Sequence, residues 1–152
     1  MKKIILKPDT YYLQDETISL YYASISYHRN GTRLNEKSQW EISIEDEFEL
    51  FNTNYSNVSG YFDNHVGWGV SYTQDADKCI VNAIGRGTSK ETLYFVKYLD
   101  GGKDNKWHGY PANYMLNIHD KPSSHFLTAI YNEGIISKPQ FAKIKKGKRC
   151  DL

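Results

Sequence analysis

One short segment of the chain brings together an imidazole, an ammonium group and a phenol. Lys106, His108 and Tyr110 all lie within the sequence Lys-Trp-His-Gly-Tyr-Pro, residues 106–111. An imidazole titrates near neutral pH, and an ammonium group nearby can stabilise developing negative charge. Together these groups are sufficient for metal-independent cleavage of RNA by acid–base catalysis. The competing interpretation is structural, with Trp107 and Tyr110 packed in the core and His108 in a local hydrogen bond.

The histidines and cysteines do not predict a metal centre. No two of the five histidines have the HxxxH spacing of ligands on one helix face, and neither an HExxH motif nor a His/Cys zinc spacing occurs. We therefore expect neither a metal ion nor a cofactor. The cysteines, Cys79 and Cys150, form no CxxC pair and are expected to be free thiols in a reducing compartment.

A cluster of acidic residues marks a second candidate site. Aromatic residues accompany the carboxylates and can act as anchors, so the cluster could mimic phosphate and occupy the basic cleft of a nucleic-acid enzyme. Charge complementarity of this kind gives fast and specific association. The alternative interpretation is a solvated turn of helix on the surface. The candidate contact residues are Glu45, Asp46, Glu47, Glu49, Phe48 and Trp40.

The C-terminal segment is basic and suggests a third type of contact. Two helices joined by a short turn, followed by cationic residues, are also found in DNA-binding proteins. The second helix is short, however, and its lysines would contact phosphates without reading bases. The alternative is a basic helix end that the helix macrodipole favours. The cationic residues are Lys143, Lys145, Lys146, Lys148 and Arg149.

Hydrophobic periodicity predicts the strands that must position these groups. The largely apolar run Leu93–Leu99, the turn at Asp100-Gly101-Gly102 and the aromatic-rich residues 106–111 predict a β-hairpin with a long loop. A capping-box pattern at Thr88 and Glu91 offers a helix over residues 89–98 instead, but the β-branched and aromatic content favours a strand. Further strands are predicted at Lys2–Leu6, at Ile18–Tyr27 with a hairpin turn at Asn30-Gly31, at Val66–Tyr72 and at Cys79–Ile84.

Capping residues predict the helices. Ser43 is placed to cap a helical turn over the acidic cluster, and the polar residues Asn52–Gly60 predict a loop. Asp120-Lys121-Pro122 predicts the start of a helix that Gly134 ends. Ser137 is expected to cap a second helix that ends at Gly147. The apolar residues Phe126, Leu127, Ile130, Tyr131, Phe141 and Ile144 are spaced to give these two helices an inward face.

Length and charge limit what the whole chain can be. Its 152 residues suit a single α+β domain, residues 1–152, in which a mainly antiparallel sheet carries a C-terminal helical hairpin packed on it. The net charge of +1 argues against generic nucleic-acid binding. It conceals an asymmetry, because residues 1–76 carry a balance of −5 and residues 77–152 a balance of +6. With no signal-peptide core and no run of membrane-spanning length, the chain is expected to be cytoplasmic and not to contact membranes.

The sequence therefore favours a small cytoplasmic protein-binding module. Its most specific form is an inhibitor or immunity-type protein that blocks a basic protein partner, such as a nuclease toxin, through the acidic cluster. One alternative is a metal-independent ribonuclease that uses His108 with Lys106 and Tyr110. The other is a DNA-binding regulator that uses its basic C-terminal helices to contact nucleic acid.

Overall fold

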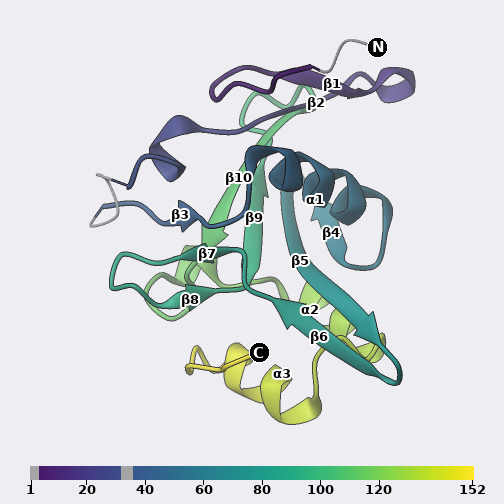
Figure 1. Cartoon of the computed structure of the whole chain (residues 1–152). Coiled ribbons are helices and arrows are strands. Elements are labelled where there is room, and N and C mark those ends of the chain that lie inside the picture. The colour runs from purple at the N-terminus through teal and green to yellow at the C-terminus, as the bar shows by residue number, and fades with distance from the viewer. Residues whose placement is uncertain (1–3, 32–35) are drawn as a thin grey trace.

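The computed structural model describes residues 4–31 and 36–152 of the chain, and this part contains two β-sheets and three α-helices (Figure 1). The α-helices are α1 (Ile44–Ser56), α2 (Ser124–Asn132) and α3 (Lys138–Lys145). The strands are β1 (Tyr12–Asp15), β2 (Leu20–Ala23), β3 (Gln39–Trp40), β4 (Gly60–Asp63), β5 (Val66–Asp75), β6 (Lys78–Asn82), β7 (Gly85–Arg86), β8 (Thr92–Leu93), β9 (Phe95–Leu99) and β10 (Lys106–Ala112). Single turns of 3₁₀ helix lie at Glu16–Ile18 (η1), Ser26–His28 (η2) and Ile118–Asp120 (η4).

The larger sheet has the strand order β1-β2-β10-β9-β5-β4, and β6 extends it by pairing with β5. The smaller sheet has the order β3-β7-β8. Among the described strands, every pair is antiparallel except β2 with β10, where Tyr22 lies opposite Trp107 in a parallel register. The predicted hairpin is present as β9 and β10. The expectation of an α+β fold with a mainly antiparallel sheet is therefore confirmed.

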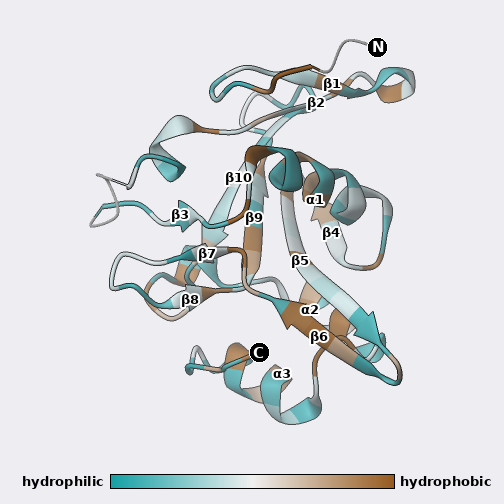
Figure 2. Ribbon diagram, in the orientation of Figure 1, coloured by the Kyte–Doolittle hydropathy of each residue, from teal (hydrophilic) through white to brown (hydrophobic). Residues whose placement is uncertain are grey.

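Strand β9 lies at the centre of the larger sheet and separates two hydrophobic cores. Figure 2 shows it as largely hydrophobic, because both of its faces are covered. Phe95 belongs to the core beneath α2 and α3, which we call the α2/α3 core. Val96 and Tyr98 belong to the core beneath α1, the α1 core. Since neighbouring residues of a strand point to opposite faces, α1 lies on one face of the sheet and the helical hairpin on the other.

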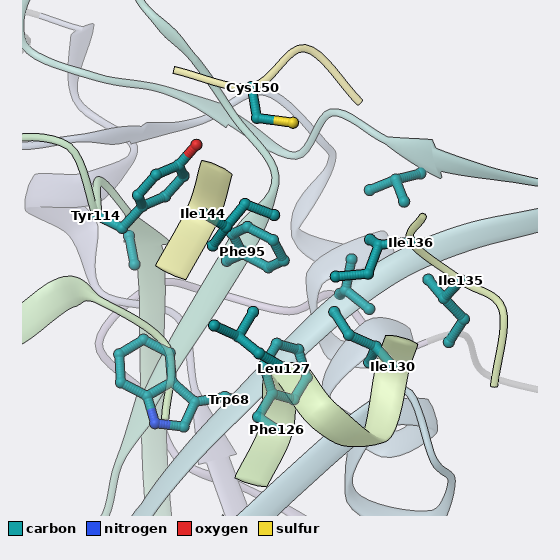
Figure 3. Packing of buried hydrophobic residues seen from close by; sticks show 13 residues of the cluster. Trp68, Phe95, Tyr114, Phe126, Leu127, Ile130, Ile135, Ile136, Ile144 and Cys150 are labelled. Atoms are coloured by element: carbon teal, nitrogen blue, oxygen red, sulfur yellow. The ribbon is translucent and has the colours of Figure 1, made fainter. Parts of the chain in front are cut away.

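The helical hairpin packs on the sheet as the apolar spacing predicts. Figure 3 shows Leu127 and Ile130 of α2 with Ile144 of α3 in the same cluster as Phe95. Ser137 caps α3 in a capping box with Gln140. Gly134 and Gly147 follow the two helices at φ values of +75° and +72°, which glycine adopts without strain.

The start of α2 differs from the prediction. Ser123 caps the helix by accepting a hydrogen bond from the Phe126 amide, and Asp120 lies upstream at the end of η4. Aspartate before a proline and serine before the first apolar residue are both good start signals. The carboxylate of Asp120 instead accepts a hydrogen bond from Tyr110, so a tertiary contact determines which signal is used.

Helix α1 begins at the predicted cap but is longer than predicted. Ser43 accepts a hydrogen bond from the Asp46 amide, and three acidic residues lie in the first turn, where the helix dipole favours them. The helix continues through Asn52–Ser56, which the sequence predicts as loop. Asn54 explains the extension: it is buried, donates to the Val70 carbonyl at 3.0 Å and accepts from the Tyr98 hydroxyl at 2.8 Å. These contacts override its weak helix propensity.

Two predicted features near the N-terminus are wrong. Residues 4–6 form no strand, while residues 2–3 lie outside the described part of the chain. The long strand predicted at Ile18–Tyr27 is limited to β2. Asn30-Gly31 does not join β2 to the next described strand in a hairpin, because β2 pairs with β1 and β10 whereas β3 pairs with β7. Local turn chemistry is outweighed by the non-local pairing of β2 with β10.

Both cysteines are free thiols. Cys79 is half-buried on β6, and Cys150 is buried in the α2/α3 core. Among the described residues, no helix has the length and apolar content needed to cross a membrane.

Candidate functional site

A cavity of about 490 Å³ lies beside β10 and contains His108. Its walls come from parts of the chain that are distant in sequence: the η2 segment, residues 36–38 before β3, residues 87–88 after β7, the end of β9, β10, and the segment around η4. The cavity contains imidazole, phenol, ammonium and carboxylate groups together. Its polar side chains include those of Tyr27, His28, Glu36, Lys37, His108, Tyr110 and Asp120.

His28 is the residue in this cavity that sequence reasoning missed. It is 7% exposed, and its Nδ1 lies 2.8 Å from the Ser38 carbonyl oxygen. Because a carbonyl can only accept, Nδ1 carries the proton of the neutral imidazole and Nε2 keeps its lone pair. The ring stacks on Tyr110, with centroids 5.1 Å apart and planes within 9°. These two contacts fix the orientation of the ring.

Tyr110 positions other groups and is not suited to proton transfer. Its hydroxyl donates to the Asp120 carboxylate at 2.5 Å, and its pKa is raised by burial and by that carboxylate. A phenol held in this way stays protonated at neutral pH. The structure thus changes the role expected for Tyr110 from acid–base catalysis to support of the His28 ring.

His108 lies in the cavity but Lys106 does not line it. On β10, His108 is half-buried and lies opposite Ala23 of β2 and Leu99 of β9. Lys106 occupies the exposed start of the strand, where its ammonium group lies 5.9 Å from the centre of the Tyr21 ring. The cation in the cavity wall is Lys37, which the sequence did not single out.

The two imidazoles of the cavity favour their neutral forms. Burial lowers the pKa of His28, and Lys37 and His108 lower it further, against the opposing effects of the Ser38 carbonyl and Asp120. Burial also lowers the pKa of His108, and the negative charge of Asp100 opposes that shift. Both rings line the same cavity, so a positive charge on His108 opposes a second positive charge on His28.

The acidic cluster is divided between surface and core. Glu45, Asp46 and Glu49 are exposed on α1, and none of the three has an ion-pair partner among the described residues. Glu47, Phe48 and Trp40 are buried in the fold, so they cannot contact a partner as expected. An α-helix turns one side of the cluster inward, and this periodicity separates Glu47 from its neighbours.

Glu47 is the centre of a buried polar network. Its carboxylate accepts hydrogen bonds from Tyr22 at 2.5 Å, Ser24 at 2.7 Å and the Arg29 guanidinium at 2.7 Å. Burial raises the pKa of Glu47, while these donors oppose the shift. Arg29 also donates to the Ile42 carbonyl at 2.9 Å. Both oxygens of the Glu47 carboxylate therefore accept hydrogen bonds inside the fold, and the group has a structural role.

A groove of about 700 Å³ lies alongside the exposed acidic face of α1. Asp46 and Glu49 contribute its carboxylates. Its apolar lining includes Leu50 of α1, Tyr72 of β5 and Ile84, which lies between β6 and β7. The Tyr72 side chain is 38% exposed. The groove and the histidine cavity share no lining residue, so they are separate sites.

The basic C-terminal residues lie on the other face of the sheet from this groove. The buried side of α3 faces the α2/α3 core through Ile144, which leaves the cations exposed. These exposed cations are Lys143, Lys145, Lys146, Lys148 and Arg149. Helix α3 has eight residues. Nucleic-acid binding by this segment stays a prediction.

Within the described residues, no group of three or more His, Cys, Asp or Glu side chains is placed to hold a metal ion. Comparison of the chain with protein-family models, with curated proteins and with solved structures found no match.

Proposed function

We propose that the protein is a small protein-binding module that takes a basic segment of a partner protein into the groove beside α1. The most specific form of the proposal is an inhibitor or immunity-type protein that blocks a basic enzyme such as a nuclease toxin. The observation that carries it is the lining of the groove, where the Asp46 and Glu49 carboxylates stand beside apolar side chains.

Charge and shape both support a basic partner. The exposed carboxylates of α1 have no ion-pair partner among the described residues, so their charge is available to an incoming cation. The chain's own basic tail lies on the opposite face of the sheet, and none of the ion pairs that the structure describes joins it to these carboxylates. Apolar groups such as Leu50 and Tyr72 would pack against the aliphatic parts of lysine and arginine side chains.

Reversing the charge of the groove tests the proposal. We expect Asp46→Lys/Glu49→Lys to slow association with the partner about tenfold or more at low salt and to weaken its salt dependence, because electrostatic steering is lost. The matched control is Glu16→Lys/Glu133→Lys, which makes the same change in net charge at exposed positions outside the groove.

Affinity capture from the native host, followed by mass spectrometry, supplies the partner. Wild type and the control pair are expected to retain the same basic protein, and the groove pair to lose it. Equal capture by all three proteins would contradict the proposal. Capture of nucleic acid alone would contradict it as well, and would favour the basic tail.

A further inference from the structure

The two histidines of the cavity beside β10 have no part in protein binding at the groove. We propose that this cavity is an acid–base site that cleaves the phosphodiester backbone of RNA without a metal ion. This proposal is independent of the protein-binding function, because the two sites share no lining residue. It differs from the residue set suggested by the sequence, since His28 and Lys37 replace Tyr110 and Lys106.

His28 is the base. The hydrogen bond that Nδ1 donates to the Ser38 carbonyl leaves the Nε2 lone pair as the proton acceptor. Within the described residues Nε2 has no hydrogen-bond partner. The stacked Tyr110 ring holds the imidazole in one plane, and the Tyr110–Asp120 hydrogen bond holds Tyr110 in turn. Because the His28 ring is already held in one orientation, little conformational entropy is lost when it accepts a proton from a substrate.

His108 is the acid. It lines the same cavity, where burial lowers the pKa of its imidazolium form and the negative charge of Asp100 opposes part of that shift. No described residue makes a hydrogen bond to its ring, so both ring nitrogens are available to a ligand. The pair therefore provides one imidazole held in a proton-accepting tautomer and a second whose two ring nitrogens are open to a ligand in the same cavity.

The reaction that fits this pair is transesterification of RNA. Nε2 of His28 takes the proton of a ribose 2′-hydroxyl, and the 2′-oxygen forms a bond to the adjacent phosphorus. The bond from phosphorus to the 5′-oxygen breaks, and protonated His108 gives its proton to that oxygen. The products are a 2′,3′-cyclic phosphate and a free 5′-hydroxyl, so one proton enters the site and one leaves it.

The charges of the cavity set the expected affinity. Lys37 supplies a cation for the phosphate, while the carboxylates of Glu36 and Asp120 also line the cavity. The Asp120 carboxylate is engaged by Tyr110. Because the wall sets one cation against two carboxylates, we expect weak binding of substrate, with selectivity arising from the need for a 2′-hydroxyl.

The pH dependence follows from the positions of these groups. His28 must be neutral and His108 protonated, and the pKa values of both are lowered from the usual value of about 6.5. The titratable and charged groups around His28 in the cavity are Tyr27, Glu36, Lys37, His108, Tyr110 and Asp120, and the charge of Asp100 acts on His108. The rate is therefore expected to be bell-shaped, with its maximum below pH 6.5.

Cleavage of a fluorescent single-stranded RNA dodecamer in EDTA tests the proposal. Wild type is expected to release fragments ending in a 2′,3′-cyclic phosphate, identified by mass spectrometry, and to leave the DNA of the same sequence intact. His28→Gln and His108→Gln should each lower the rate about 10²–10⁴-fold. The matched control is His125→Gln, an exposed histidine that stacks on Tyr61 outside the cavity and should cleave at the wild-type rate.

A binding measurement keeps the test decisive if the buried His28 variant folds poorly. Titration of wild type with the 2′-O-methyl form of the dodecamer, which cannot react, should shift the imidazole NMR signals of His28 and His108 and leave that of His125 in place. Absence of cleavage by folded wild type would overturn the proposal. So would cleavage that EDTA abolishes, or cleavage that both cavity variants retain.

Discussion

Two Arg–Glu pairs of equal length occupy opposite environments in this molecule. Arg29 and Glu47 meet at 2.7 Å with side chains 18% and 0% exposed. Arg86 and Glu41 also meet at 2.7 Å, but their side chains are 44% and 42% exposed. A buried charge that loses its partner is left without solvation, whereas an exposed one regains water. Distance alone therefore does not determine what such a pair contributes to stability.

We predict that Arg29→Ala lowers the free energy of unfolding by about 3–5 kcal/mol, because it leaves the Glu47 carboxylate buried without its cation. Arg86→Ala, the matched control, should change it by about 1 kcal/mol or less. Urea unfolding at pH 7 measures both. Equal effects of the two substitutions would show that Glu47 is neutral or solvated in the native state.

Helix α2 shows how an apolar pattern becomes a buried face. Phe126, Leu127 and Ile130 are all at most 1% exposed, and they pack on β5 and β9 in the α2/α3 core. Thr128, between them in sequence, is exposed. The period of 3.6 residues separates these side chains, so the effect of a truncation in α2 should depend on which face it removes.

Ile130→Ala should lower the free energy of unfolding by about 2–5 kcal/mol, since it deletes buried methylene groups and leaves a cavity. Thr128→Ala on the same helix should have little effect, because it removes an exposed side chain. Denaturant unfolding monitored by circular dichroism separates the two. If Ile130→Ala matched wild type, the inward face of α2 would not be packed, and an exposed hairpin would favour the DNA-binding alternative.

At the scale of the whole molecule, one sheet serves both cores. Adjacent residues of β9 enter different cores, with Phe95 on the α2/α3 side and Val96 on the α1 side. The three tryptophans are also divided, since Trp68 belongs to the α2/α3 core and Trp40 and Trp107 to the α1 core. Because the same strands supply side chains to both cores, loss of packing in one core should loosen the strands that the other core needs.

We therefore predict a single cooperative unfolding transition, as the sequence-based expectation of one domain requires. In Trp68→Phe the remaining tryptophans report the α1 core alone. Adding Ile130→Ala, on the far side of the sheet, should lower the denaturation midpoint by the same amount in fluorescence and in circular dichroism. A fluorescence midpoint that stays in place while the other falls would reveal two independently folding units.

Features that depend on neighbours in sequence were predictable, and those that depend on distant partners were not. The β9–β10 hairpin, the Ser43 cap and the Ser137 capping box follow from a few adjacent residues. The parallel pairing of β2 with β10, which displaced the expected hairpin at Asn30-Gly31, joins the two halves of the chain.

The candidate sites show the same division. His108 was identified from its own segment, but its companion His28 lies in η2, and only the fold brings the two together. In the sequence Glu47 is one of four acidic residues with nothing to distinguish it. In the fold its carboxylate accepts hydrogen bonds from Tyr22, Ser24 and Arg29. A sequence pattern can predict which faces of a helix or strand are buried, but it does not identify the polar side chains from distant parts of the chain that bind there.

The position of β2 between β1 and β10 has a consequence for the chain as it is being synthesised. The ribosome adds residues 24–105 after it has completed β1 and β2 and before it reaches β10, so one edge of β2 lacks its permanent neighbour during that interval. An unpaired strand edge recruits other chains. The nascent protein should therefore gain from a chaperone that shields this edge, and the need should end when β10 emerges from the exit tunnel.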